Sequence, residues 1–144
     1  MPTYKAPLRD LQFIMHEVLD LSQYSDLPVF AEMDVDTIDA ILGESAKFAE
    51  EVLTPLNRVG DEHGCVRHED GSVTTPPGFK EAYAQFVEAG WQSLPMPAEV
   101  GGMGLPSVIA VATSEMIYAS NMAFGLCPML TSSAVKAVMA HASD

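Results

Sequence analysis

The sequence feature that most restricts the fold is an amphipathic repeat that begins after Asp36. Apolar residues recur at intervals of three or four positions up to Pro55, and charged residues occupy positions between them. This spacing predicts an α-helix that buries one face in a protein core. Asp34 or Asp36 can cap its start, because an aspartate side chain accepts hydrogen bonds from free backbone N–H groups. Pro55 predicts a kink or the start of the last turn, with an end near Gly60 or Gly64.

Other segments also show apolar residues at helical spacing, and the sequence therefore predicts an all-α protein, a bundle of about five to six helices. These segments comprise residues 8–22, 79–89, 107–119 and 126–140. No convincing pair of strands is evident. We expect a single helical domain over residues 1–144, in which residues 1–35 form an amino-terminal helix and a crossing segment and residues 36–144 form the helical core.

The sequence also predicts the positions of individual residues in these helices. In the first helix, the apolar residues recur largely at intervals of three and four and are expected on its apolar face: Leu8, Leu11, Phe13, Ile14, Met15, Val18 and Leu19. Trp91 follows a helix with an aromatic stripe and is expected to pack back onto that stripe. Ser107 can cap the helix that follows, which is apolar around most of its circumference and should therefore be central.

The segment Gly90–Pro106 is rich in glycine and proline and contains the only tryptophan of the chain. Proline fixes φ and glycine permits positive φ, so we expect a connector of defined shape between two helices. Its run Gly101–Gly104 opens a helix, an arrangement that can receive a phosphate. No strand precedes these glycines, however, so the run does not form a dinucleotide-binding fingerprint.

The amino-acid composition argues against several classes of protein and of binding partner. With 48% hydrophobic and 19% charged residues, the chain is expected to form a compact domain and not a disordered one. Seven Lys and Arg against twenty Asp and Glu give a formal net charge of -13. This balance argues against nucleic acids and anionic membrane surfaces as partners, since both require clustered cations.

The cysteines and the amino terminus predict a cytoplasmic protein. Cys65 and Cys127 lie far apart without a CxxC spacing, so neither a zinc site nor a disulfide framework is expected. The first residues show no basic region followed by a long apolar core, which a secretory signal would require. No uninterrupted apolar run approaches membrane-spanning length, and no membrane insertion is expected.

Few residues have the chemistry of an active site. Glu115 interrupts the apolar central helix, where a carboxylate serves either as a hydrogen-bonded structural group or as a catalytic base, but no second titratable group accompanies it in the sequence. Asp61, His63, His68 and Asp70 are metal-ligand types, yet they lie on a turn-rich segment without finger or helix-face spacing. We expect neither a metal site nor a catalytic residue in this chain.

Four stretches taken in order resemble the amino-terminal α-domain of the acyl-CoA dehydrogenase family. They are Gly78–Tyr83, Glu88–Trp91, Pro97–Pro106 and Ser114–Met116. The start of the chain, Tyr4–Asp10 with Phe13, further resembles the long-form bacterial branch that includes 3-methylmercaptopropionyl-CoA dehydrogenase-like proteins. The resemblance covers essentially the whole chain.

The resemblance implies a flavoenzyme that oxidises an acyl-CoA thioester to the 2,3-enoyl-CoA with FAD as cofactor and an electron-transfer acceptor as partner. In the family, the flavin motif and the usual catalytic glutamate follow this domain, so the chain is expected to be a fragment that binds no FAD alone. The helix matching residues 126–140 lines the acyl pocket in the family. By that resemblance, possible substrate-binding residues are Leu126, Met129, Leu130 and Ser133, although ordinary core packing fits the same side chains.

Two other function classes remain open. A stand-alone acidic helical protein-interaction module would account for the acidic surface, and a helical acid–base enzyme would centre on Glu115. Continuation of the reading frame beyond Asp144 into a flavin domain would favour the dehydrogenase. The apolar face meant for further domains also predicts that the chain associates into a homo-oligomer.

Overall fold

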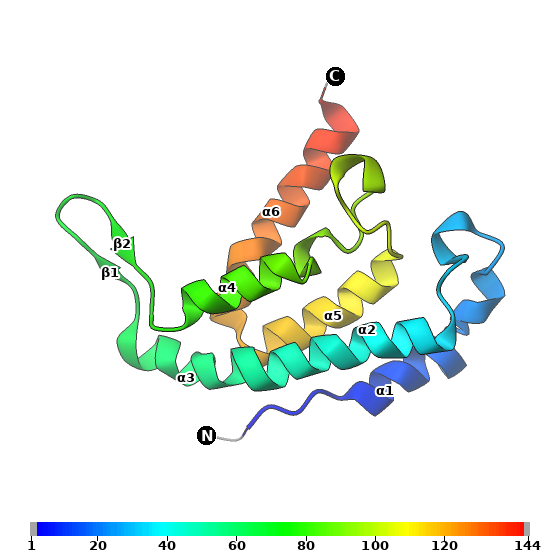
Figure 1. Cartoon of the computed structure of the whole chain (residues 1–144), viewed down its shortest axis with the longest axis horizontal. Coiled ribbons are helices and arrows are strands. Elements are labelled where there is room, and N and C mark those ends of the chain that lie inside the picture. Colours follow the sequence, from blue (N-terminus) through cyan, green and yellow to red (C-terminus); the bar gives the residue numbers. More distant parts are fainter. Residues whose placement is uncertain (1–2, 143–144) are drawn as a thin grey trace.

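The computed structural model describes residues 3–142, and they form a helical bundle with one small hairpin (Figure 1). The all-α prediction is confirmed, since the regular structure is almost entirely helical. The helices and strands are α1 (Leu8–Phe13), α2 (Val35–Lys47), α3 (Thr54–His63), β1 (Val66–Arg67), β2 (Val73–Thr74), α4 (Phe79–Glu88), α5 (Ser107–Ser120) and α6 (Met122–His141).

Helices α2 and α3 form one long rod along an edge of the bundle (Figure 1). The Asp34 side chain accepts a hydrogen bond from the Thr37 N–H at 2.7 Å, so Asp34 is the cap. A π-helical stretch, Phe48–Leu53, joins the two helices and places Pro55 in the first turn of α3, where proline needs no backbone N–H. The rod ends at Gly64, whose φ of 62° favours glycine.

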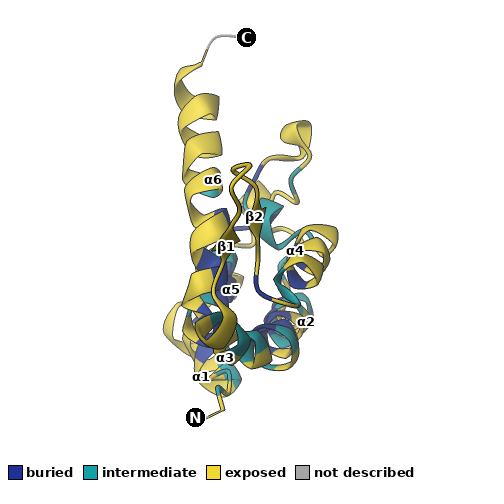
Figure 2. Ribbon diagram, turned by 90° about the vertical axis from the view of Figure 1, so that its left-hand side faces the viewer, coloured by how far each residue is buried: buried dark blue, intermediate teal, exposed yellow. Residues whose placement is uncertain are grey.

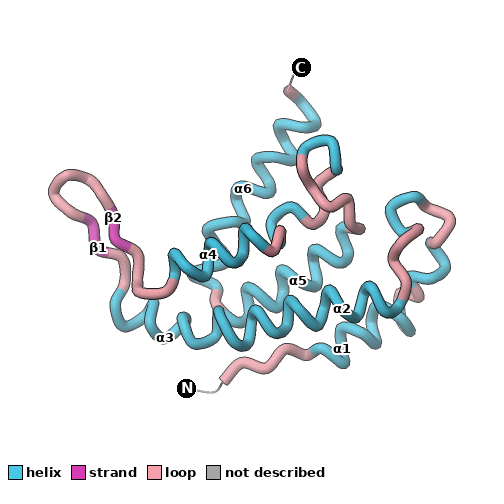
Figure 3. Tube along the Cα trace, viewed as in Figure 1, coloured by secondary structure: helices cyan, strands magenta, loops and turns pink. Residues whose placement is uncertain are grey.

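A short antiparallel hairpin projects from the end of α3, which corrects the expectation of no strand pair (Figure 3). Val66 pairs with Thr74, and Arg67 pairs with Val73. The tip is closed by Asp70, which accepts hydrogen bonds from the Ser72 N–H and hydroxyl at 2.9 and 2.7 Å. Strands of two residues leave no period-two pattern to read, so local turn chemistry formed a ladder that the sequence pattern did not reveal.

The core consists of two clusters on either side of α5. Helices α1, α2 and α5 pack Leu11, Leu42 and Met116 together in the first cluster. The second cluster is aromatic, and Phe48 and Phe124 lie there with ring centroids 6.4 Å apart. Figure 2 shows these buried residues concentrated where α5 meets its neighbours, so the prediction of a central helix is confirmed.

The amino-terminal helix is more exposed than predicted. Phe13 and Val18, expected on its apolar face, are 58% and 62% exposed, whereas Leu11 and Met15 are buried. Phe13 lies in α1 two residues from Leu11, so the α-helix places these two side chains on different faces. Val18 lies in a π-helical stretch over residues 14–18, where α-helical spacing no longer predicts which face a residue occupies. His16 Nε2 lies 2.8 Å from a carboxylate oxygen of Asp39 and ties this segment to α2.

Helix α6 begins at Met122, earlier than predicted, and its 20 residues reach His141. With a mean hydropathy of 1.3 it is long and apolar enough to cross a membrane by length and composition, although Thr131, Ser132, Ser133 and Lys136 interrupt its apolar residues. Helix length and composition alone are weak evidence for insertion. Only its first turns are covered by the bundle, through Phe124, Gly125 and Pro128.

The caps of α5 and α6 differ from expectation. Ser107 lies inside the first turn of α5 after Pro106, and its side chain makes no capping hydrogen bond. Asn121 instead caps α6, because its side-chain oxygen accepts a hydrogen bond from the Phe124 N–H at 3.0 Å. The gap between the predicted helices 107–119 and 126–140 therefore narrows to the single residue Asn121.

Candidate functional site

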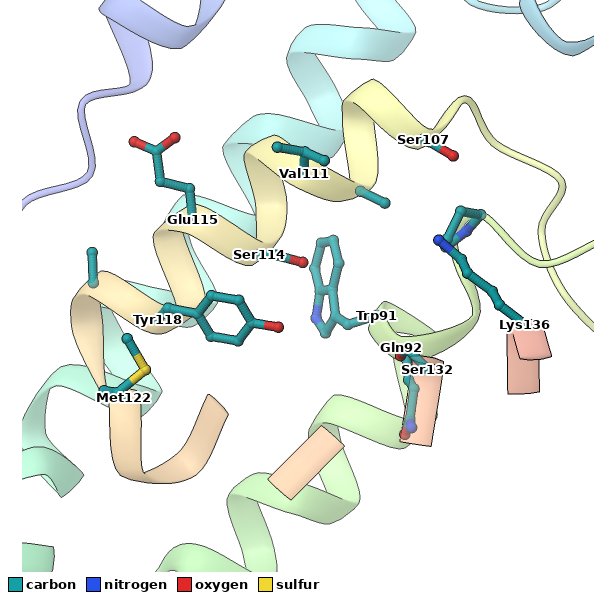
Figure 4. A pocket seen from close by; sticks show the side chains of 13 residues that line it. Trp91, Gln92, Ser107, Val111, Ser114, Glu115, Tyr118, Met122, Ser132 and Lys136 are labelled. Atoms are coloured by element: carbon teal, nitrogen blue, oxygen red, sulfur yellow. The ribbon is translucent and has the colours of Figure 1, made fainter. Parts of the chain in front are cut away.

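The site of interest is a cavity of about 650 Å³ between α5, α6 and the turn after α4 (Figure 4). Helix α5 supplies one wall, α6 supplies a second wall, and the turn at Trp91 closes a third. The residues that line it are Trp91, Gln92, Pro95, Ser107, Ala110, Val111, Ser114, Glu115, Tyr118, Ala119, Met122, Ser132 and Lys136. We refer to it as the α5–α6 cavity.

Trp91 is held in place at the edge of this cavity by the aromatic cluster. Gly90 ends α4 with a φ of 73°, which redirects the chain and brings the indole back over the helix. The Trp91 ring stacks on Phe48 with ring centroids 6.4 Å apart and belongs to the same packed cluster as Phe86. The prediction that Trp91 packs back onto the aromatic stripe is confirmed.

Several polar groups of the cavity have no partner within residues 3–142. The side chains of Trp91, Gln92, Ser114, Tyr118 and Lys136 make no hydrogen bond or ion pair there. In Figure 4 the Ser114 and Tyr118 hydroxyl groups point toward the side of the cavity occupied by the indole. Such groups lose free energy when they are desolvated unpaired, so the cavity suits water or a polar ligand.

Glu115 is not the buried carboxylate that the sequence predicted. Its side chain is exposed on the wall of the α5–α6 cavity, and Figure 4 shows the carboxylate directed away from Trp91. Burial, followed by the negative charges of Glu115 and Glu50, raises the pKa of Tyr4, which places the Glu115 charge near the amino-terminal segment. Tyr118, one turn further along α5, and Lys136 on α6 line the same cavity, so titratable groups do accompany Glu115.

The four residues expected at the acyl pocket form one stripe along α6. Leu126 and Leu130 are 51% and 71% exposed, and Met129 and Ser133 are also exposed. Their spacing places them on the face opposite Phe124 and Pro128, which are buried against the bundle. They border the α5–α6 cavity in sequence but do not line it. Their role in substrate binding stays a prediction.

The metal-ligand types in the hairpin region do not assemble. Within residues 3–142, no group of three or more His, Cys, Asp or Glu side chains is arranged to hold a metal ion. A nitrogen of His63 lies 3.1 Å from the Val59 carbonyl, and a nitrogen of His68 lies 2.8 Å from the Thr74 hydroxyl. Both imidazoles therefore make local contacts.

The backbone N–H groups of the glycine run form hydrogen bonds within the connector itself. The N–H groups of Gly102, Met103 and Gly104 donate to backbone carbonyls at 3.0, 3.1 and 2.8 Å. A Cβ at Gly102 would meet the Met96 carbonyl oxygen at 2.0 Å, so glycine is needed for the close approach of two backbone segments. With these donors used, the loop does not provide a phosphate cradle.

Comparison with known proteins identifies the domain. Residues 36–144 match the family model described as the acyl-CoA dehydrogenase N-terminal domain. Over 142 residues the chain is 44% identical to 3-methylmercaptopropionyl-CoA dehydrogenase of Ruegeria pomeroyi. The chain belongs to the acyl-CoA dehydrogenase family. It is also 31% identical over 124 residues to the broad-specificity linear acyl-CoA dehydrogenase FadE5 of Mycobacterium tuberculosis.

These similarities confirm the family and the branch that the sequence resembled. The two matches cover 99% and 85% of this chain, but 24% and 20% of the relatives. The chain thus spans about a quarter of the length of the curated relatives it matches. The segment before residue 36 lies outside the acyl-CoA dehydrogenase domain model but inside the longer of these alignments. The amino-terminal helix that packs Leu11 and Met15 into the core lies in this segment.

Proposed function

We propose that this chain is the amino-terminal helical domain of a FAD-dependent acyl-CoA dehydrogenase, which oxidises an acyl-CoA thioester to the 2,3-enoyl-CoA. The observation that supports this proposal best is the 44% identity to an acyl-CoA dehydrogenase over 99% of the chain. The family match over residues 36–144 supports it independently. The electron-transfer acceptor, the cytoplasmic location and assembly as a homo-oligomer belong to the same proposal.

The glycine loop of this domain does not fit the diphosphate of a flavin. FAD would accept the hydride in such an enzyme, but its diphosphate needs free backbone N–H groups or cations. The N–H groups of Gly102, Met103 and Gly104 already donate hydrogen bonds within the loop. The backbone at Gly102 also packs against the Met96 carbonyl. We therefore assign neither flavin binding nor the catalytic base to this domain.

In this proposal the domain contributes part of the acyl pocket and a packing surface for the rest of the enzyme. The stripe of Leu126, Met129, Leu130 and Ser133 on α6 is exposed and mainly apolar, so it suits either an acyl chain or a neighbouring domain. Met129 suits a variable acyl chain because an unbranched thioether adapts its shape.

A bulky substitution in the longer enzyme that contains this domain tests the acyl-pocket assignment. We expect Met129→Trp to lower kcat/KM for long acyl-CoA substrates more than for short ones, because the indole shortens the pocket. Met139→Trp is the control, since Met139 is also exposed on α6 but lies outside the stripe. Equal relative kcat/KM values across chain lengths would remove Met129 from the pocket. Turnover and a flavin spectrum of the same enzyme test the dehydrogenase proposal itself.

The alternative is a stand-alone acidic helical interaction module without enzymatic activity. Its support is the exposed apolar surface of α6 together with the net charge of -13. We favour the dehydrogenase because sequence identity to two enzymes of one class is not expected from acidity or helix content. We also propose no membrane insertion, because the first turns of α6 are packed in the bundle and Lys136 lies in its second half.

A further inference from the structure

A second cavity, of about 580 Å³, lies where the β1–β2 hairpin joins the helical bundle. The end of α3 and the base of the hairpin form one wall, and the first turns of α4 and of α6 form the others. We refer to it as the hairpin cavity. It shares no lining residue with the α5–α6 cavity, so it is a separate site.

Both cysteines of the chain line the hairpin cavity. Cys65 lies at the base of the hairpin, directly before β1, and Cys127 lies in the second turn of α6. Both thiols are free and exposed, so small reagents in solution can reach them. The tertiary structure thus brings to one cavity two nucleophilic groups that lie far apart in the sequence.

Closely packed aromatic rings connect the two cysteine-bearing segments. A Cβ on Gly60 would meet the Phe79 ring at 2.9 Å, so the end of α3 lies against the start of α4. The ring centroids of Phe79 and Phe124 are 6.4 Å apart, and Cys127 follows Phe124 by one turn on the same side of α6. Cys65 and Cys127 therefore flank one aromatic cluster.

The base of the hairpin is held loosely enough to approach α6. Within the described part of the chain, no hydrogen bond or ion pair joins residues 65–75 to a helix. Gly64 ends α3 with a φ of 62°, and Figure 3 shows the hairpin projecting from the bundle beyond that point. Residue 65 can thus move without breaking a polar contact to the bundle, and a disulfide needs Cα atoms about 4.4 to 6.8 Å apart.

We propose that Cys65 and Cys127 are a reversible thiol-oxidation site, at which a low-molecular-weight disulfide converts the two thiols to a disulfide that ties the hairpin to α6. One cysteine thiolate attacks a sulfur of the small disulfide, which forms a mixed disulfide and releases one small thiol. The second cysteine thiolate then attacks the protein sulfur of the mixed disulfide, and the second small thiol leaves. The two protein thiols are oxidised, the small disulfide is reduced to two thiols, and the protein's two thiol protons pass to them.

Equilibration with reduced and oxidised glutathione tests the proposal. After the free thiols are blocked with iodoacetamide, the mass of the intact chain separates its forms: a bridged chain has lost two hydrogen atoms and carries neither an alkyl group nor glutathione. We expect the equilibrium constant for the bridge to be at least tenfold larger in the native chain than in urea. In urea the unfolded chain must close a loop of about 60 residues, whereas the folded chain already holds both thiols at one cavity.

Two further measurements report what the bridge does to the fold. A factor that favours the bridge in the folded chain stabilises the fold equally, so each tenfold preference should raise Tm by about 3 to 6 °C. Amide hydrogen exchange in residues 65–75 should slow on oxidation, because the base of the hairpin becomes fixed to α6.

The matched control moves one thiol by a single position. In the double variant Cys127→Ser with Leu126→Cys, the chain keeps two cysteines and nearly the same loop length, but Leu126 does not line the hairpin cavity. This variant should form the bridge at least tenfold less readily. Cys65→Ser should take up one glutathione and form no bridge within the chain. Circular dichroism confirms that each reduced variant is folded.

Several outcomes would overturn the inference. They are mixed disulfides at both cysteines without a bridge, a bridge only between two chains, an equilibrium constant no larger than in urea, or equal bridging in the control variant. None of these measurements involves a flavin or an acyl substrate, so failure here leaves the dehydrogenase proposal to its own test of turnover.

Discussion

Asn121 is a single buried residue that links two parts of the bundle. Its side-chain oxygen caps α6 through the Phe124 N–H at 3.0 Å, and its amide donates to the Leu53 carbonyl at 3.2 Å. We expect Asn121→Ala to lower the free energy of unfolding by about 2 to 3 kcal/mol, because a cap is lost and a buried carbonyl loses its partner. Urea unfolding measures this loss. Asn121→Ser keeps a capping hydroxyl and should lose less; equal losses would show that the cap contributes nothing.

Glu50 connects the amino-terminal segment to the rod, and its contribution depends on pH. The hydrogen bond from Lys5, followed by that from the Ala6 N–H, lowers the pKa of Glu50 below its ordinary value of 4.5. A lowered pKa in the folded state stabilises the fold above the unfolded-state pKa, and this stabilisation is lost as the pH falls through the folded-state pKa.

We therefore expect Glu50→Gln to cost about 0.5 to 1 kcal/mol at pH 7, because the ion pair is partly exposed. The difference from the unchanged chain should disappear below the folded-state pKa of Glu50. Denaturant unfolding at pH 7 and at pH 3 checks this. Glu51→Gln is the control, since Glu51 is exposed and has no hydrogen-bond partner within residues 3–142. A difference that persists unchanged at pH 3 would contradict the role of the Glu50 charge.

At the scale of elements, the crossing of α5 and α6 depends on Gly125. A Cβ at this buried position would meet the Tyr118 ring at 2.3 Å, so any larger residue must separate the helices or rotate the ring. We expect Gly125→Ala to destabilise the fold by about 1 to 3 kcal/mol. Tyr118 lines the α5–α6 cavity with Trp91, so tryptophan fluorescence should change as well.

Gly43→Ala is the matched control for this substitution. Gly43 lies in α2, and no atom outside its own stretch of helix lies within 4 Å of the position that an alanine methyl would occupy. Alanine there should stabilise the helix by about 0.5 to 1 kcal/mol. Thermal unfolding of both variants measures the opposite signs. A stable Gly125→Ala chain with unchanged fluorescence would show that the crossing can adjust without disturbing the cavity.

The whole molecule leaves much of α6 uncovered. Figure 2 shows the upper part of this helix standing clear of the bundle, and Leu126, Leu130 and Val138 are each more than half exposed. We expect the 144-residue chain to self-associate through this surface, because contiguous apolar area favours contact over water. Leu130→Glu should shift the light-scattering mass toward the monomer. Val66→Glu on the exposed hairpin should not, and a strictly monomeric unchanged chain would contradict the prediction.

Much of the helical architecture could be predicted because its signals are local. Asp34 caps α2, Gly64 ends the rod and Gly90 ends α4, as side-chain chemistry and positive φ require. The hairpin could not be predicted, since its strands are too short to show a period. The lining of the α5–α6 cavity could not be predicted: the four α6 residues named from the resemblance do not line it, and the sequence did not associate Lys136 with Trp91.

The sequence by itself determined the helical class, the main helix ends and the family, because periodicity, capping and family motifs depend on residues close together in the chain. Tertiary structure alone decided which faces are covered. It exposed Val18 in a π-helical stretch, placed Glu115 on a cavity wall, and brought Lys136 to the same cavity as Trp91. Burial and electrostatic environment depend on contacts between elements distant in sequence, and no local pattern encodes those contacts.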